Sequence, residues 1–399
     1  MRENLSKEDK MKTLARFLLG IFIFFSLVMA NSNENQKAEW KGKIEKEVET
    51  VEYSKTPLYG ILKLNLTSPL IIGSETDARY FFTSLRETKV DKKGRIYVLD
   101  SKAARIQVYD IAGKFISTIG GKGQGPGEFF APSSFFVNEK GNIYIYDAMT
   151  RKITVFSEDW IYKEFISLNE IAHGKFSVNK KGNILFNTVA FEPDGNMYIN
   201  FIKLRPKENI KKKYISALFL KPIIDGKRRL IYEHPYQQNI YFSLLGNGNI
   251  TLVKSLEPTI YYFSGEGEIL SKVLKEEKSE RITKKEKEIV FTDFFKQMRK
   301  GLHDKVFFPE SRPIYSNLLI DDENRIYLER FKPINEKSSD YFYYVFNEKG
   351  KYLYNLVLNF RIECIKSGYV YTIKINEESG EIKLLRYKIK NWELIKRGI

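Results

Sequence analysis

A polar turn followed by an alternating apolar strand recurs six times along the chain. Each copy holds Gly or Asn in the turn, and apolar residues then alternate with others. A period of two is the pattern of β-strands, whose successive side chains point to opposite faces. The copies are KKGRIYVLD (92–100), EKGNIYIYD (139–147), KKGNILFNT (180–188), GNGNITLVK (246–254), DENRIYLER (322–330) and KSGYVYTIK (366–374).

The turn position and one strand position are similar in all six copies. Gly and Asn adopt a positive φ at least cost, which hairpin turns require. These anchors are Gly94, Gly141, Gly182, Gly248, Asn324 and Gly368. Two positions later a β-branched residue follows each time, which predicts one buried face: Ile96, Ile143, Ile184, Ile250, Ile326 and Val370.

Further strands complete each repeat. A strand–turn–strand pattern follows at 105–119, 152–168, 259–274 and 343–358, and an apolar strand precedes the turn at 133–137 and 316–320. Four short strands in each of six repeats predict an all-β fold, a six-bladed β-propeller of four-stranded antiparallel blades. Such blades stack in a ring because each is too small to bury its own faces. A strand within 58–73 is expected to pair into the last blade, because an open ring would leave two exposed edges.

The anchor spacings of 47, 41, 66, 76 and 44 residues predict insertions in the third and fourth intervals, at 191–235 and 275–313. In the second insertion, between blades four and five, apolar residues recur at helical spacing. They predict an amphipathic helix over 283–302, of about four turns or more. This helix either caps the propeller or serves as a lid or partner-binding element. Its apolar residues are Phe291, Phe294, Phe295, Met298 and Leu302.

The stretch GRIYVLDSKAARIQVYDIAGKFISTIGGKGQGPGEFFAP (94–132) resembles an NHL repeat. Over roughly residues 60–399, the chain resembles the bacterial exported six-bladed β-propellers of that family. The resemblance implies a funnel-shaped disc with loops on two faces and, in most members, a binding role. Some propeller relatives are enzymes, either calcium-dependent lactonases or lyases with metal or histidine sites.

The first 30 residues are typical of a cleaved signal peptide, with an uncleaved anchor as the alternative and Met11 as an alternative start. Lys12 and Arg16 precede the apolar run 17–30, which at 14 residues is shorter than the roughly 20 of a membrane-spanning helix. We therefore expect a linker over 31–57 and the propeller over 58–399. The protein is predicted to be exported, periplasmic or extracellular and surface-associated, with no integral span after cleavage.

The net charge limits the kinds of partner that we expect, and the cysteine content limits the disulfide bonds. The net charge of +16 favours acidic surfaces, and export makes nucleic acid an unlikely partner. We expect a monomer that binds a protein, a peptide or a glycan, acidic ones included. Cys364 is the single cysteine, so an internal disulfide is excluded, and we expect a buried thiol.

A glycine-rich loop lies at 117–132. A phosphate-binding loop needs a helix directly after its glycines, whereas here prolines and then a strand follow. We interpret the loop as the connector from the outer strand of blade one to the inner strand of blade two, or else as an anion-contacting lip built from consecutive N–H groups. Phe129 and Phe130 are expected to hold it against the disc. Its central residues are Gly121, Lys122, Gly123, Gln124, Gly125, Pro126 and Gly127.

Six residues after each anchor, one position changes from acidic to basic around the ring: Asp100, Asp147, Thr188, Lys254, Arg330 and Lys374. One interpretation is that the two aspartates bond backbone N–H groups of the turn that follows. The other is a polarised face on which Lys254, Arg330 and Lys374 orient an acidic ligand.

No catalytic motif stands out. His173, His234 and His303 lack ligand spacing, and no EF-hand loop or nucleophile-elbow motif occurs. We therefore expect a non-enzymatic binding or scaffold propeller, with the ligand or partner on one face or at the central channel, and no cofactor. The alternative is a metal-dependent hydrolase or lactonase of propeller type. Only that alternative calls for calcium.

Overall fold

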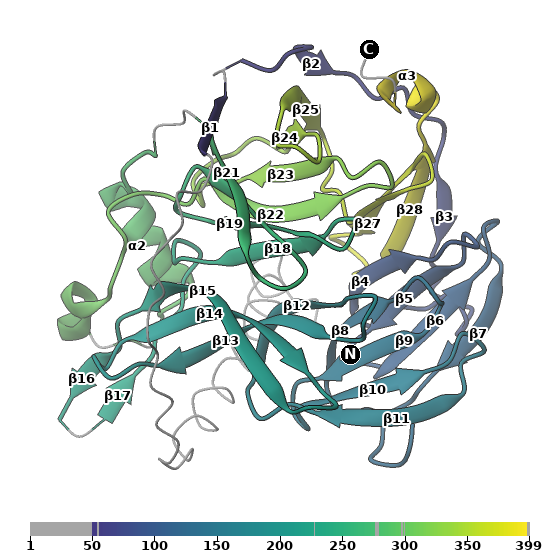
Figure 1. Ribbon diagram of the computed structural model, residues 1–399, viewed down its shortest axis with the longest axis horizontal. Coiled ribbons are helices and arrows are strands. Elements are labelled where there is room, and N and C mark those ends of the chain that lie inside the picture. Colours follow the sequence, from purple (N-terminus) through teal and green to yellow (C-terminus); the bar gives the residue numbers. More distant parts are fainter. Residues whose placement is uncertain are drawn as a thin grey trace, which may run out of the picture.

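The computed structural model describes residues 50–53, 56–226, 228–275, 279–296, 298 and 300–396. Six of their sheets are blades arranged around a common centre, and a seventh is a two-stranded hairpin (Figure 1). Each blade has four antiparallel strands, and two of the blades gain a fifth, parallel strand from the N-terminal part of the chain. The predicted six-bladed all-β propeller is thus confirmed. The predicted signal peptide, residues 1–30, lies outside the described residues. No helix within the described ranges has the length and apolarity needed to cross a bilayer.

The first three blades follow one another along the chain, each from its inner to its outer strand. Blade one consists of β4 (Leu85–Val90), β5 (Ile96–Asp100), β6 (Arg105–Tyr109) and β7 (Phe115–Ile119). Blade two consists of β8 (Pro132–Val137), β9 (Ile143–Asp147), β10 (Lys152–Phe156) and β11 (Tyr162–Ser167). Blade three consists of β12 (Ala172–Val178), β13 (Ile184–Phe191), β14 (Met197–Arg205) and β15 (Ile210–Leu220).

The last three blades have the same order, except that the last strand of blade six comes from the N-terminal part of the chain. Blade four consists of β18 (Ile240–Leu244), β19 (Ile250–Lys254), β20 (Thr259–Phe263) and β21 (Ile269–Lys275). Blade five consists of β22 (Tyr315–Ile320), β23 (Ile326–Arg330), β24 (Tyr341–Phe346) and β25 (Tyr352–Leu358). Blade six consists of β26 (Cys364–Lys366), β27 (Tyr369–Ile375), β28 (Ile382–Lys388) and β3 (Leu70–Ile72).

The six repeat positions behave as the sequence predicts. Every anchor has a positive φ, between 57° at Asn324 and 87° at Gly248. All six β-branched residues two positions later, from Ile96 to Val370, have a relative exposure of 0%. The turn therefore requires Gly or Asn for its backbone conformation, and the residue that follows it enters the core.

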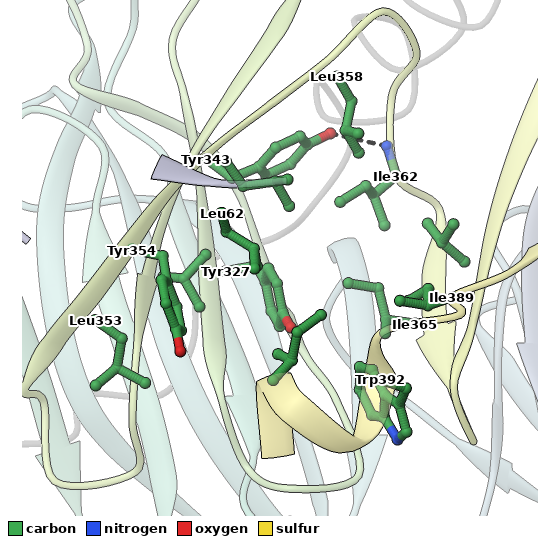
Figure 2. Close-up of a cluster of buried hydrophobic side chains, with 14 residues drawn as sticks. Leu62, Tyr327, Tyr343, Leu353, Tyr354, Leu358, Ile362, Ile365, Ile389 and Trp392 are labelled. Atoms are coloured by element: carbon green, nitrogen blue, oxygen red, sulfur yellow. Dashed lines mark hydrogen bonds between the residues drawn. The ribbon is translucent and has the colours of Figure 1, made fainter. Parts of the chain in front are cut away.

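The hydrophobic core is divided among the interfaces between neighbouring blades. On β5, Ile96 packs with Tyr371 of blade six, whereas Tyr97 packs with Phe135 of blade two. The alternation of side chains thus supplies two interfaces from one strand. Figure 2 shows the interface between blades five and six, where the Tyr343 hydroxyl accepts a hydrogen bond from Ile362 N at 2.8 Å.

An N-terminal strap, residues 50–53 and 56–72, runs along the outer edges of three blades (Figure 1). Strand β1 (Thr50–Tyr53) pairs in parallel with β21, and β2 (Ile61–Leu62) pairs in parallel with β25. Then β3 pairs antiparallel with β28, with Ile72 opposite Leu384, so a strand from the N-terminal part of the chain and the C-terminal strands share blade six. The prediction of a linker over 31–57 is wrong at 50–53. An exposed sheet edge presents unpaired N–H and C=O groups, and β1 covers one such edge.

The predicted insertion 191–235 is also wrong in part. Strands β14 and β15 fall within it and are the outer half of blade three. Blade three has longer strands than its neighbours, up to the 11 residues of β15, and this length widens the anchor spacing. Only the chain beyond residue 220 is additional, and it includes the hairpin of β16 (Ile223–Asp225) and β17 (Arg228–Leu230).

The helical insertion lies between blades four and five, as predicted, but its helix is shorter. Helix α2 (Lys284–Asp293) ends where the chain turns back, and a separate 3-10 turn, η2 (Lys300–Lys305), follows. The turn back packs Phe291 and Phe295 with Phe308 in a local cluster that a continuous helix would not form. A capping box of Thr283 and Glu286 begins α2. Near the C-terminal end, α3 (Trp392–Lys396) packs Trp392 into the core of Figure 2.

Candidate functional site

The inner strands of the blades lie side by side around the centre of the ring: β4 next to β8, β8 next to β12, β18 next to β22, and β26 next to β4. Propellers use this region for ligands because every blade contributes side chains to it. Polar and charged residues of five blades interact there. They are Arg86, Glu87 and Lys89 of blade one, Ser134 of blade two, Lys175 of blade three, Glu329 of blade five, and Arg361 and Glu363, which directly precede β26.

Glu87 joins blade one to blade two. Its Oε2 accepts hydrogen bonds from Ser134 Oγ at 2.9 Å and Phe135 N at 3.0 Å, and its Oε1 lies 2.9 Å from Lys89 Nζ. Burial opposes ionisation of Glu87, but the charges of Lys89 and Lys175 outweigh it, so the pKa is lowered. Glu87 is therefore an anion fixed in place between two blades.

Arg361 and Glu329 form a second fixed pair, joining blades five and six. Arg361 Nε donates to both carboxylate oxygens of Glu329, at 3.1 and 3.0 Å, and Ser316 Oγ donates to Glu329 Oε1 at 2.9 Å. Burial opposes the charge of Arg361, but Glu329 and Glu363 outweigh it and raise the pKa. Tyr241, on the inner strand of blade four, lies within electrostatic range of this pair, and burial raises its pKa.

Lys175 is placed by an irregularity in β12. The register between β12 and β13 shifts between His173 and Phe176, which leaves Gly174 and Lys175 without opposing residues. Gly174 has a φ of +78°, as in bulges that begin with a left-handed glycine. Such a bulge interrupts the regular alternation and redirects the next side chain. Lys175 is exposed to solvent, and among the described residues no carboxylate lies within 4 Å of its Nζ.

The electrostatic partners of Lys175 lie on other blades. They are Lys89 and Glu87 of blade one and Arg361 and Glu363 next to blade six. In a six-bladed ring, blade three is separated from blade one by blade two, and from blade six by two blades. Lys175 therefore interacts electrostatically with these charges across the centre of the ring. Enclosure by the surrounding blades, reinforced by the charge of Lys89, lowers the pKa of Lys175.

Two further ionisable groups near the centre have pKa values shifted toward the neutral form. Burial raises the pKa of Glu363, and neighbouring Glu329 and Glu87 act in the same direction against Arg361 and Lys175. Burial also lowers the pKa of His173, which forms a side-chain hydrogen bond with Asn239. The centre thus combines fixed ion pairs with an unpaired amine and a carboxyl group that retains its proton more readily than usual.

Arg86 is a second cation of this region. It is exposed, and its Nε donates to the backbone oxygen of Ser133 at 2.6 Å. The register of β4 shifts between Leu85 and Glu87, so Arg86, like Lys175, lies in a bulge. Burial lowers the pKa of Arg86. Two bulges on inner strands therefore carry cations whose charged forms are poorly compensated.

The two predicted aspartates have structural roles. Asp100 accepts hydrogen bonds from Thr83 N and Ser84 N, which precede β4. Asp147 accepts from Met149 N and Thr150 N of the following turn, as predicted. It also accepts from Phe130 N and Ala131 N before β8. Both carboxylates are buried and hold the connector to the end of the second strand.

The three predicted cations are differently placed. Arg330 Nη2 contacts both carboxylate oxygens of Glu336, at 2.8 and 3.1 Å, and Lys254 pairs with Glu257. Lys374 is exposed on β27. The polarised face remains a prediction. Two of its three cations, Arg330 and Lys254, each have their own glutamate nearby that compensates their charge.

The glycine-rich loop connects β7 of blade one to β8 of blade two. Phe129 is buried at 1% exposure, whereas Phe130 is 42% exposed, so only the first ring holds the loop in place. Gly125 N donates to Glu128 Oε2 at 2.9 Å. The carboxylate of Glu128 thus occupies the position that an external anion would take in a lip of N–H groups.

Cysteine and metal ligands add little to the site. Cys364 is free and half-buried on β26, and burial raises the pKa of its thiol to about 11. Within the described ranges, no three His, Cys, Asp or Glu side chains form a group suited to hold a metal ion.

Most of the central residues lie on or next to the inner strands, whereas the sequence repeat marks the second strand of each blade and so does not reveal them. The signal that could have found Lys175 is the glycine before it, because Gly174 interrupts the apolar stretch that precedes the anchor Gly182. The electrostatic interactions of Lys175 with Glu87 and Glu363 across the ring have no counterpart in the spacing of the sequence.

Comparison with known families supports the fold. The family model DUF5128, described as a 6-bladed beta-propeller, matches residues 71–343. A putative exported protein from Bacteroides fragilis is similar in structure, with a TM-score of 0.54 and 15% identity over 86% of this chain and 99% of its own. A member of the DUF4221 family from Bacteroides vulgatus has a TM-score of 0.51 and 9% identity over 82% and 98%. No curated protein sequence is significantly similar to the chain.

Proposed function

Because the chain belongs to DUF5128, a family of six-bladed β-propellers, we propose that it is an exported binding protein that takes up an anionic ligand at the centre of the ring. Blades one and two are, in this proposal, NHL-type repeats, on the motif over 94–132. Export is supported by the basic residues and the apolar run of the first 30 residues.

One observation carries the proposal: Lys175 is a solvent-exposed cation on an inner strand, and no carboxylate is in contact with it among the described side chains. The surrounding blades disfavour the charge of its amine unless an opposite charge is close by. An anion bound beside Lys175 would supply that charge, and the same holds for Arg86. The fixed carboxylates Glu87 and Glu329 are already committed to their partners, and so they do not compete for the amine at contact distance.

The ligand class follows from this charge. A carboxylate-bearing glycan or peptide end fits a site that offers one free amine and one guanidinium. The overall charge of +16 would steer such a ligand toward the protein, with a dependence on ionic strength.

Isothermal titration calorimetry with two acidic probes, pentaglutamate and trigalacturonate, tests the proposal. We expect one of them to bind, more weakly as salt is added. Lys175→Met should weaken binding about tenfold or more, which corresponds to about 1.4 kcal/mol. Lys374→Met is the matched control, because it removes an equal charge from an exposed strand position. Equal affinity of Lys175→Met and the wild type, or no binding of either probe, would contradict the proposal.

A further inference from the structure

A cluster of cations lies at the boundary between blades three and four, away from the centre of the ring. It surrounds one turn of blade four, Gly265–Glu266, which lies between β20 and β21. Four cations of blade three contact this turn: Lys181, Lys203, Arg205 and Lys212. We propose that this cluster is a second binding surface, which takes an extended acidic polysaccharide.

Glu266 is the carboxylate in the middle of the cluster. Its Oε1 accepts a hydrogen bond from Lys181 Nζ at 2.9 Å. Its Oε2 accepts from Lys203 Nζ at 2.8 Å and from Arg205 Nη2 at 3.2 Å. Lys212 Nζ donates to the backbone oxygen of Glu266 at 2.8 Å. The hydrogen bonds from Lys203 and Lys181 lower the pKa of the Glu266 carboxyl to about 2, so Glu266 is an anion near neutral pH.

The positive charge of the cluster exceeds the negative charge in contact with it. Arg205 has one further carboxylate, Glu208 at 3.2 Å, so four cations face two carboxylates. Among the described residues, no carboxylate lies within 4 Å of Lys212 Nζ. Lys207 is exposed in the turn between β14 and β15 and adds to the excess. A surface with an excess of one charge raises the local concentration of ligands of the opposite charge.

The arrangement suits an extended ligand better than a single ion or a bilayer. The side chain of Lys203 is 2% exposed and is committed to the turn, whereas that of Lys181 is 73% exposed. Lys212 is exposed as well, on the outermost strand of the blade, so the accessible cations are spread across blade three. A bilayer favours several apolar side chains that insert beside the cations. Within residues 180–183, 203–213 and 264–268, the large apolar side chain of Ile210 alone is exposed.

The cluster and the centre lie at different ends of the inner strands. Lys181 belongs to the anchor turn that follows the end of β12, whereas the bulge at Gly174 lies near the start of that strand. In blades of four antiparallel strands, the anchor turns lie on one face of the ring and the connectors between blades lie on the other. A polymer bound to the cluster would therefore leave the centre open to the anionic ligand of the proposed function.

Binding to immobilised heparin, a sulfated and carboxylated polysaccharide, tests the inference by surface plasmon resonance. We expect the mature wild-type protein to bind, more weakly as salt is added. Lys181→Gln combined with Lys212→Gln should weaken binding about tenfold, because both cations reach solvent and each contributes an attraction that salt screens. Lys114→Gln combined with Lys390→Gln is the matched control, because it removes the same charge from exposed positions in or next to blades one and six. Equal losses in the two double variants, or no binding of heparin, would overturn the inference.

The carboxylate in the middle of the cluster gives a test of opposite direction. Glu266→Gln removes a negative charge, while the amide oxygen can still accept the hydrogen bond from Lys203. Heparin should then bind about twofold to fivefold more tightly, because the excess of positive charge is larger. Unchanged or weaker binding of a folded Glu266→Gln protein would count against a polyanion site at this turn.

Two further measurements separate this surface from other sites. Vesicles of phosphatidylglycerol are the alternative occupant. If they bind more tightly than heparin and depend on Lys181 and Lys212, the surface belongs to a membrane and the inference fails. The double variant Lys181→Gln with Lys212→Gln should bind the short acidic probe of the proposed function within about twofold of the wild type, since screening limits the influence of a distant charge. Loss of that probe as well would mean that the cluster is not a separate surface.

Discussion

Ser134 Oγ of blade two donates a hydrogen bond of 2.9 Å to the buried carboxylate of Glu87 in blade one. The same carboxylate accepts from Phe135 N and pairs with Lys89, so four groups of two blades meet beside the centre of the ring. An ion pair of this kind holds its members in one geometry. The centre is thus a place where the charges of the inner strands are fixed before any ligand arrives.

Loss of the Glu87 carboxylate should destabilise the ring. Glu87→Ala leaves Lys89 without its partner and Ser134 without its acceptor, so we expect a loss of about 3–5 kcal/mol in the free energy of unfolding. Urea denaturation followed by tryptophan fluorescence measures it. Glu139→Ala is the control, because Glu139 pairs with Lys92 and Lys180 on the surface and should change stability by less than about 1 kcal/mol. Equal effects would contradict the role given to Glu87.

Strand β3, which completes blade six, contains two isoleucines that differ in burial. Ile72 is 1% exposed and packs into the core between blades six and one, whereas Ile71 is 54% exposed on the same strand. Ile72→Ala should cost about 2–4 kcal/mol, from lost burial and the cavity that remains. Ile71→Ala should change stability by about 0.5 kcal/mol or less. Thermal unfolding of both variants checks this, and similar midpoints would show that β3 does not close the ring through its core side chain.

Glu233 makes stability depend on pH. Burial raises the pKa of its carboxyl to about 7 from an ordinary value of 4.5. Between these values the folded protein binds more protons than the unfolded chain, so this group lowers stability as the pH rises through that window. In Glu233→Gln the group no longer titrates. The variant should gain stability relative to the wild type from about pH 4.5 upward and level off above about pH 7, by on the order of 1–3 kcal/mol.

The neighbouring His234 changes stability with pH in the opposite direction. Burial lowers its pKa to about 4, so its contribution rises with pH between about 4 and 6.5. This contribution is present in the wild type and in Glu233→Gln, and it cancels in their difference. Urea denaturation at a series of pH values gives that difference. A gap between the two proteins that does not change from pH 4 to pH 8 would contradict the assignment to Glu233.

A comparison of Gly174 with Gly182 distinguishes the effect of backbone strain from the effect of the bulge on the position of Lys175. Gly174 and Gly182 have φ values of +78° and +79°, and an added Cβ would meet no atom within 4 Å at either position. Gly174→Ala and Gly182→Ala should therefore each cost about 1–2 kcal/mol. Only Gly174→Ala should weaken binding of the acidic probe, because only Gly174 belongs to the bulge that places Lys175. Calorimetry on both variants decides this, and equal loss of binding would mean that the bulge has no special role.

Local patterns predicted the blades well. The anchors from Gly94 to Gly368 and the buried residues from Ile96 to Val370 follow from the φ of a hairpin turn and the period of a strand, which neighbouring residues alone specify. The patterns failed where one strand departs from the usual length, as in β15, and where apolar spacing was extended beyond a helix end, as after Asp293. They also missed β1, because its partner β21 lies far away in the sequence.

The sequence by itself determined the number of blades, their turns and their buried positions, since these depend on conformational preferences and on alternation over a few residues. It also determined the excess of positive charge. Only the tertiary structure decided which charges meet. Lys175, Glu87 and Glu363 come from three blades and approach one another because the ring brings all inner strands to one centre, and a bulge at Gly174 sets the position of the amine. Contacts across a ring depend on its closure, and no local spacing encodes them.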